Sequence, residues 1–179
     1  AYTTKSNAPA LASQSGTFIT TSAGGTDHGP VHVVDQYHFG YADGTPYREI
    51  GTTCYAWIQQ SDALQQQTLK TLAAAPFNKL RMCVFPKWYE YNRAEPPIYP
   101  FVGTAPNQWN YTQFNPEYFR HLEKRVADLR ALGIEADIIL FHPYDGGHWG
   151  FDRMGAENDD RYVRYIVARL SACLLYTSP

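Results

Sequence analysis

The sequence predicts an α/β fold in which apolar strands alternate with amphipathic helices. Three β-type runs, residues 50–57, 80–85 and 134–141, are each followed by a helical pattern. Continuous apolar strands separated by helices are typical of a parallel sheet that helices cover. The chain has 179 residues, of which 44% are hydrophobic and 18% charged, which is the composition of a globular protein.

The first 36 residues differ from the rest in composition. Residues 1–36 are polar and rich in Gly, Ser, Thr and Ala, with short β-like stretches at 17–21 and 31–34. We expect the end of a preceding β domain, or a linker, because this part has too little apolar surface for its own core. The dipeptide Asp43-Gly44 between two aromatic-rich runs then predicts a β-hairpin over residues 37–47.

Each predicted helix begins at a residue that favours a helix start. Ser61 or Asp62 can cap the first helix, which we expect to run to about residue 75. Asn115, followed by Pro116, is a strong start for the second helix, and Gly133 is a typical glycine directly after its end. The third helix is predicted from residue 159 or 160 onward.

Two architectures fit this order, an open doubly wound sheet and a (β/α)8 barrel. The nucleotide-binding open sheet has a glycine-rich turn after its first strand, whereas residues 55–60 contain no glycine. The long loops 86–114 and 142–158 follow the second and third strands, where barrel enzymes build their sites. A barrel is therefore favoured. A whole barrel takes about 200–250 residues, so residues 37–172 would hold its first three βα units, a partial TIM barrel.

Charge and cysteine content exclude several classes of function. Lys and Arg total 15 and Asp and Glu total 17, so no basic excess indicates nucleic acid or an anionic membrane as a partner. No apolar run is long enough to span a bilayer. The 3 cysteines form no CxxC pair, which argues against a zinc site or a disulfide framework. We expect no metal and no cofactor.

Aromatic content is the unusual feature of the composition. Aromatic residues make up 15% of the chain, with 14 Tyr and 4 Trp, which is more than a core needs. Carbohydrate-binding clefts use such rings because sugar C–H faces pack on them while hydroxyl groups meet polar edges. The composition therefore points to a carbohydrate as the binding partner.

Five stretches together carry a resemblance that no one of them would carry alone. They are HFGYADGTP at 38–46, IGTTCYAW at 50–57, NKLRMCVFPK at 78–87, FNPEYF at 114–119 and LFHPYD at 140–145. This set resembles the apiosidase-like family of bacterial glycoside hydrolases, a branch of the clan A barrel glycosidases that often follows an immunoglobulin-like β domain. The resemblance implies hydrolysis of a plant or microbial polysaccharide, with two carboxylates and retention of configuration. It also suggests a periplasmic or secreted protein.

The resemblance also implies that the catalytic pair is missing from this chain. In clan A enzymes the acid/base Glu follows strand four and the nucleophile Glu follows strand seven. We therefore expect an inactive N-terminal fragment of an active parent. Residues 173–179 depart from the family pattern, so we expect a non-native tail there. The alternative is a non-catalytic carbohydrate-binding barrel, which would lack an Asn-Glu after strand four. A third hypothesis is an unrelated barrel enzyme that uses a phosphate or a metal. The sequence does not favour it, because it has no glycine-rich phosphate-binding loop and no clear set of three metal ligands.

Two residues are expected to support the catalytic carboxylates. Strand alternation places Arg81, Cys83 and Phe85 on one face, which we expect to point into the barrel. A buried guanidinium needs a carboxylate partner, which we expect from outside this chain. In clan A an Arg on strand two orients the nucleophile, and the resemblance implies this role for Arg81. His142 ends the third strand in phase with Ile138 and is expected to face inward beside it.

Aromatic and polar residues follow all three predicted strands and are expected to line one rim of the barrel. A metal cluster of His142, Asp145 and His148 is a weaker interpretation of the third loop, because hydrogen bonding to sugar hydroxyls fits its Gly146-Gly147 better. The predicted substrate-binding residues are Tyr55, Trp57, Lys87, Trp88, Tyr89, Tyr144, Asp145 and Trp149.

Overall fold

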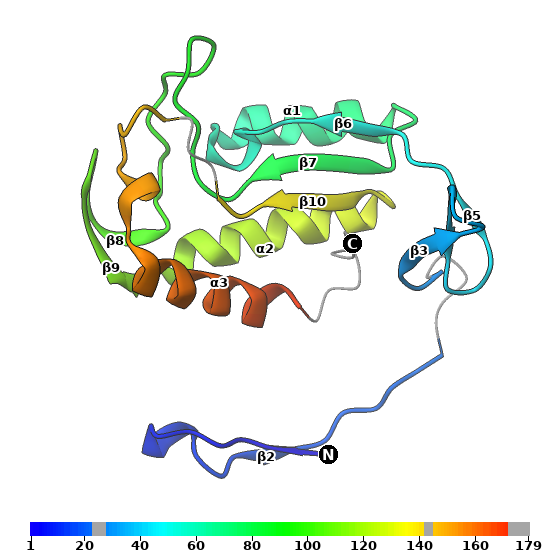
Figure 1. The fold of residues 1–179 in the computed structure, drawn as a ribbon, viewed down its shortest axis with the longest axis horizontal. Coiled ribbons are helices and arrows are strands. Elements are labelled where there is room, and N and C mark those ends of the chain that lie inside the picture. Colours follow the sequence, from blue (N-terminus) through cyan, green and yellow to red (C-terminus); the bar gives the residue numbers. More distant parts are fainter. Residues whose placement is uncertain (23–27, 142–144, 172–179) are drawn as a thin grey trace.

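A computed structural model describes residues 1–22, 28–141 and 145–171 of the chain. Its N-terminal segment pairs strand β1 (Tyr2–Thr3) with β2 (Ser15–Gly16) in antiparallel fashion, and a short 3-10 turn (Pro9–Leu11) lies between them. This segment lies apart from the main body (Figure 1). The β-like stretch expected at residues 17–21 is not part of a strand.

The predicted hairpin is present and belongs to a three-stranded antiparallel sheet. Strands β3 (Val31–Val34), β4 (His38–Tyr41) and β5 (Pro46–Tyr47) lie in this order. The backbone N–H of Thr45 donates to Asp43 Oδ1 at 2.9 Å, and Gly44 has a φ of 88°. A positive φ at this position explains the glycine of the turn.

Three parallel strands form the central sheet, in the order in which they follow one another in the sequence (Figure 1). Strand β7 (Lys79–Cys83) lies between β6 (Gly51–Thr53) and β10 (Glu135–Ile139). Sequential order is what a barrel requires, and an order with β6 in the middle would have indicated the doubly wound sheet. The closed barrel itself stays a prediction, because three strands do not close.

Helix starts follow the predicted caps in two of three cases. Ser61 caps α1 (Asp62–Ala73), and the Asn115 side chain accepts from the Glu117 N–H at 3.1 Å at the start of α2 (Pro116–Ala131). Helix α3 (Ala156–Leu170) begins earlier than expected and has no side-chain cap. No helix in the described ranges is long and apolar enough to cross a membrane.

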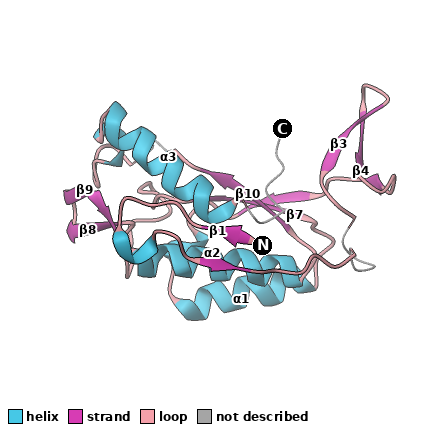
Figure 2. Ribbon diagram, turned by 90° about the horizontal axis from the view of Figure 1, so that it is seen from below, coloured by secondary structure: helices cyan, strands magenta, loops and turns pink. Residues whose placement is uncertain are grey.

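One apolar core joins the helices to the sheet. Leu80 and Met82 of β7 are fully buried, in a cluster with side chains from all three helices. Figure 2 shows α1 and α2 together along the same side of the sheet. Leu80 and Met82 share one cluster with buried residues of these helices, so they face this side. The helix residues in this cluster are Leu72, Leu122, Val126, Leu129, Tyr162, Ile166 and Leu170.

The long loop predicted after β7 contains an antiparallel hairpin that the sequence analysis missed. Strands β8 (Phe101–Thr104) and β9 (Gln108–Phe114) pair within the expected loop 86–114. Phe85, expected on the open face of the sheet, is 1% exposed, because it lies beyond the end of β7 and stacks on Phe151 with ring centroids 4.9 Å apart. Phe101 of β8 also packs on Phe85, with ring centroids 6.4 Å apart, so the hairpin helps to bury the aromatic residues at this end of the sheet.

Candidate functional site

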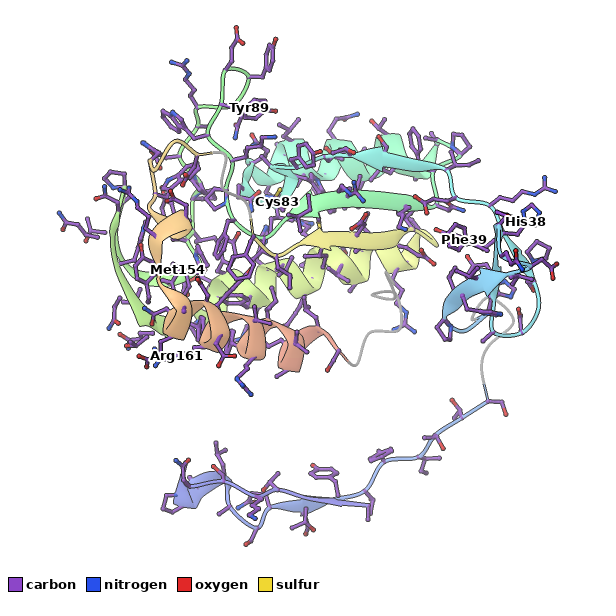
Figure 3. All side chains as sticks on the ribbon, viewed as in Figure 1. His38, Phe39, Cys83, Tyr89, Met154 and Arg161 are labelled. Carbon is purple, nitrogen blue, oxygen red and sulfur yellow. The ribbon has the colours of Figure 1, made fainter. Side chains whose placement is uncertain are left out.

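The carboxyl ends of β6, β7 and β10 point the same way, so the segments that follow them meet at one edge of the sheet (Figure 1). In Figure 3, Tyr89 lies on the loop that rises above this edge, beyond Cys83 at the end of β7. In parallel α/β folds this edge is where ligands bind. The side chains of these segments form two ring clusters.

The first cluster brings together the loops after β7 and β10. The Trp88 ring stacks on the His148 ring with centroids 3.8 Å apart and planes 19° apart. Trp149 meets Trp88 edge to face, with centroids 5.8 Å apart. Trp88 and His148 are partly exposed, so they present a ring surface at the edge of the sheet.

A carboxylate, Glu95, joins these two loops. Its Oε1 accepts a hydrogen bond from His148 Nε2, and its Oε2 accepts from Trp149 Nε1 at 2.9 Å and from the Tyr99 hydroxyl. A carboxylate only accepts hydrogen bonds when ionised, so His148 carries its proton on Nε2 here. Burial raises the pKa of Glu95, but the hydrogen bonds from Tyr99, His148 and Trp149 outweigh it and hold the pKa below its usual value.

The second cluster forms around Lys87. Its Nζ lies 4.1 Å from the centre of the Tyr55 ring and 4.7 Å from the centre of the Tyr89 ring. Cation–π contacts of this kind hold an ammonium group in place. The structure therefore gathers three of the predicted binding residues, Tyr55, Lys87 and Tyr89, although Tyr55 follows strand β6 instead of belonging to it.

Arg81 has a carboxylate partner within the chain, contrary to our expectation. It lies opposite Asp137 in the β7–β10 register, and its Nε donates to Asp137 Oδ2 at 2.8 Å. The hydrogen bond to Asp137 raises the pKa of Arg81. The Arg81 side chain is 54% exposed, so the guanidinium lies on an open face of the sheet and is not buried. Asp137 was not considered as this partner, because the sequence alone does not give the register that places it opposite Arg81.

Trp57 does not lie on the rim. Strand β6 ends at Thr53, and Trp57 opens a 3-10 turn (Trp57–Gln59), so it does not share a strand face with Tyr55. Its ring is 3% exposed, and its Nε1 donates to the backbone carbonyl of Gln65 at 3.2 Å. Trp57 is a core residue of the α1 side of the sheet.

Asp145 and Trp149 build the loop, and their side chains do not present a surface to a ligand. Asp145 is 3% exposed and accepts from the backbone N–H groups of Gly147 at 2.8 Å and Trp149 at 3.3 Å. Trp149 is fully buried, and its carbonyl accepts from Trp109 Nε1 at 2.8 Å. The Asp145 side chain and the buried Trp149 therefore fix the shape of the loop that carries His148.

The end of the third strand falls partly outside the described residues. His142 and Tyr144 lie outside them, as does the tail 173–179. The register pairs Ile138 with Met82, whose side chain packs against the helices. Ile138 therefore lies on the helix-covered face of the sheet, and Asp137 lies on the opposite face, which we expected to be the inside of the barrel. Within the described ranges, no three His, Cys, Asp or Glu side chains gather as a metal site would require.

Glu95 and Tyr99 are the functional candidates that sequence reasoning missed. They lie in a proline-rich stretch without periodicity, which gives no sign of where a side chain points. His148 was considered only as a metal ligand. A spacing of 53 residues separates Glu95 from His148, and only the fold brings them together.

Comparison with known proteins extends these observations. Residues 34–175 match the family model of the apiosidase-like catalytic domain. The structure resembles that of a putative glycoside hydrolase from Bacteroides vulgatus ATCC 8482, with 46% sequence identity and a TM-score of 0.87. The match covers 93% of this chain and 34% of that one, so this chain spans a minor part of its relative's length. No curated protein gives a significant match.

More distant structures share the fold. One is described as a glycoside hydrolase and aligns with a TM-score of 0.57 at 13% identity. The other is a family 5 glycoside hydrolase from Bacteroides vulgatus ATCC 8482 and aligns with a TM-score of 0.57 at 14% identity. These alignments cover 80% and 79% of this chain and 32% and 30% of the other chains. The mixed α/β architecture is therefore that of glycoside hydrolases. Because the family model matches most of its length, the chain belongs to the apiosidase-like family, within the catalytic domain.

Proposed function

We propose that this chain forms the N-terminal part of a (β/α)8 glycoside hydrolase that acts on a plant or microbial polysaccharide. The observation that carries the proposal is the ring surface of Trp88 and His148 at the carboxyl edge of the parallel strands. Family membership and the likeness to a putative glycoside hydrolase support it. A stacked, partly exposed pair of rings suits the apolar face of a sugar.

Lys87, Tyr55 and Tyr89 extend the proposed sugar-binding surface. The ammonium of Lys87 is held over the two tyrosine rings, at 4.1 and 4.7 Å from their centres. A fixed ammonium donates hydrogen bonds to sugar hydroxyl or carboxylate oxygens, while the tyrosine rings add apolar contact. Tyr144 and His142 lie outside the described residues, and their roles as a binding and a supporting residue stay predictions.

The proposed reaction is hydrolysis with retention, by two carboxylates that this chain does not itself supply. Three of the carboxylates on or beside the sheet have fixed partners: Asp137 pairs with Arg81, Asp145 binds two backbone N–H groups, and Glu95 accepts three hydrogen bonds. A retaining pair must lie about 5–5.5 Å apart across a glycosidic bond, with one member protonated. Engagement of all three in fixed contacts supports a catalytic pair from outside these 179 residues.

Arg81 is proposed to support that pair from the open face of the sheet. Asp137 orients the guanidinium through Nε and Nη2, which both lie 2.8 Å from the same oxygen, Oδ2. A guanidinium held in this way can direct a further N–H group toward a carboxylate on the same face. Such a contact keeps the carboxylate ionised, which a nucleophile requires.

The test is an assay of the full-length protein that carries this chain. Hydrolysis of nitrophenyl glycosides and soluble plant cell-wall polysaccharides is followed by proton NMR, which distinguishes the first-formed anomer. We expect hydrolysis with the starting configuration retained. Binding of the same polysaccharides without hydrolysis would contradict the enzymatic proposal, and an inverted product would contradict the retaining mechanism alone.

A further inference from the structure

We infer that Glu95 is the positioning residue of the sugar-binding surface, because it holds His148 against the ring of Trp88. This inference rests on the proposed function. Glu95 belongs to the segment after β7 that also carries Trp88, whereas His148 and Trp149 belong to the segment after β10. The side chain of Glu95 joins these two segments through His148 Nε2 and Trp149 Nε1.

Ring contact alone does not fix the surface. Trp88 and His148 are both partly exposed, and a stack between exposed rings is easily lost to rotation of the imidazole. The hydrogen bond to Glu95 sets the imidazole plane, since it fixes the direction of the Nε2–H bond. With His148 held, the imidazole lies within 19° of parallel to the indole.

Glu95 is itself held firmly enough to act in this way. The Tyr99 hydroxyl and Trp149 Nε1 both donate to its Oε2, and the Trp149 side chain is fully buried. Lowering of the Glu95 pKa by these donors keeps the carboxylate ionised at neutral pH, so its hydrogen bonds are charge-assisted and stronger than neutral ones. Because Glu95 is itself bound to the buried Trp149, it holds the loops after β7 and β10 in a fixed position relative to each other.

The experiment is a double-mutant cycle on the full-length protein, with Trp88→Ala, Glu95→Ala and the double variant. The probes are nitrophenyl glycosides and soluble plant cell-wall polysaccharides. We expect Glu95→Ala to raise KM by about tenfold with little change in kcat, as loss of one ring contact would. In the Trp88→Ala background, Glu95→Ala should have almost no further effect, because Glu95 acts through the Trp88 ring.

Two further variants separate positioning from simple loss of structure. In Glu95→Gln the amide oxygen can still accept from Tyr99 and Trp149, and the amide N–H can donate to Nε2 of a His148 that carries its proton on Nδ1, so this variant should restore most of the lost affinity. Glu90→Ala removes an exposed Glu from the same loop and should leave KM unchanged. The inference would be overturned if Glu95→Ala lowered kcat by the same factor by which it raised KM. It would also be overturned if Glu95→Ala raised KM equally in the presence and in the absence of the Trp88 ring.

A spectroscopic arm needs no substrate. Difference spectra between each variant and its Trp88→Phe partner isolate the near-UV circular dichroism of Trp88. We expect Glu95→Ala to remove this signal and Glu90→Ala to keep it; an unchanged signal in Glu95→Ala overturns the inference whatever the activity. If instead Trp88→Ala leaves KM unchanged while the Trp88 signal depends on Glu95, the proposed sugar surface is wrong but the positioning role stands.

Discussion

Arg81 and Asp137 face each other across neighbouring parallel strands, and the guanidinium Nε lies 2.8 Å from the carboxylate. The pair lies on the face of the sheet that the helices leave open, and the Asp137 side chain is only 14% exposed while that of Arg81 is 54% exposed. The carboxylate is therefore largely enclosed, and the cation reaches outward. This arrangement makes Asp137 an orienting partner for Arg81.

Loss of Asp137 should have a small effect on the stability of the isolated chain. Asp137→Ala leaves a guanidinium that water can solvate, so the free energy of unfolding should fall by only about 0.5–1 kcal/mol. Urea denaturation followed by tryptophan fluorescence measures this. A loss above about 3 kcal/mol would show that Arg81 depends on Asp137 as a buried charge does, and the open face would be wrong.

Glu135→Gln should stabilise the protein at pH 7.5 and have no such effect at pH 4. Burial raises the pKa of Glu135, although the Tyr47 hydroxyl donates to its carboxylate at 2.8 Å and opposes the shift. A raised pKa in the folded state favours folding at low pH, and this contribution is lost as the pH rises through that pKa. The amide still accepts from Tyr47 and carries no charge.

The measurement is the melting temperature of both proteins across this pH range. Glu90→Gln serves as a control, because it removes the same charge from an exposed Glu. If Glu135→Gln instead lowers the melting temperature at pH 7.5, the ionised carboxylate stabilises the fold and the direction of the shift is wrong.

Gly103→Ala should disrupt the β8–β9 hairpin. A Cβ at this position would lie 2.1 Å from the backbone oxygen of Gln108, so the strand backbone would have to move. Gly133→Ala is the matched control, because its φ of 71° gives strain but no atom lies within 4 Å. We expect a loss of about 1 kcal/mol for Gly133→Ala, as for a residue forced into a left-handed conformation, and a clearly larger loss for Gly103→Ala.

Thermal melts compare the two glycine variants directly. Because the Trp109 indole donates to the Trp149 carbonyl, displacement of β9 should also change the near-UV circular dichroism in Gly103→Ala. Equal losses for both variants, with unchanged aromatic signals, would show that the hairpin tolerates the side chain and does not support the loop of His148.

Tyr118→Phe should lower the free energy of unfolding by about 1–2 kcal/mol, because it removes a fully buried hydroxyl that donates to the Val84 carbonyl and accepts from Gln59 Nε2 at 2.9 Å. Urea denaturation measures the change, with Tyr91→Phe as a control at a ring that is 83% exposed. No difference between the variants would mean that Gln59 alone satisfies the Val84 carbonyl, to which it also donates at 2.9 Å.

The sequence predicted the elements that depend on local chemistry. Asn115 with Pro116 and Gly133 marked both ends of α2, and Asp43-Gly44 marked the hairpin turn. The β8–β9 hairpin was missed because its prolines and glycine obscured the alternation of Trp109 and Tyr111, which was the available signal. Local patterns thus indicate helix caps and turns. They do not reveal a pair of strands when proline and glycine residues interrupt the alternation of apolar and polar residues.

The site was predicted in outline, and its details depend on long-range contacts. Tyr55, Lys87 and Trp88 gather at the carboxyl edge, as parallel strands require. Trp57 and Trp149 were assigned to the rim because they are aromatic, although the sequence cannot tell which ring the chain buries. The hydrogen bond between Glu95 and His148 joins two segments that are far apart in the sequence, and no short sequence motif indicates such a contact.

The most direct test of the central claim is a crystal structure of the full-length protein with a bound oligosaccharide. We predict a sugar ring in van der Waals contact, about 4 Å, with the indole of Trp88, and a glycosidic oxygen that neither Glu95 nor Asp145 can reach. A sugar bound away from the carboxyl edge of the parallel strands would contradict the account. So would a glycosidic oxygen placed within hydrogen-bond distance of Asp145, because the catalytic acid would then belong to this chain.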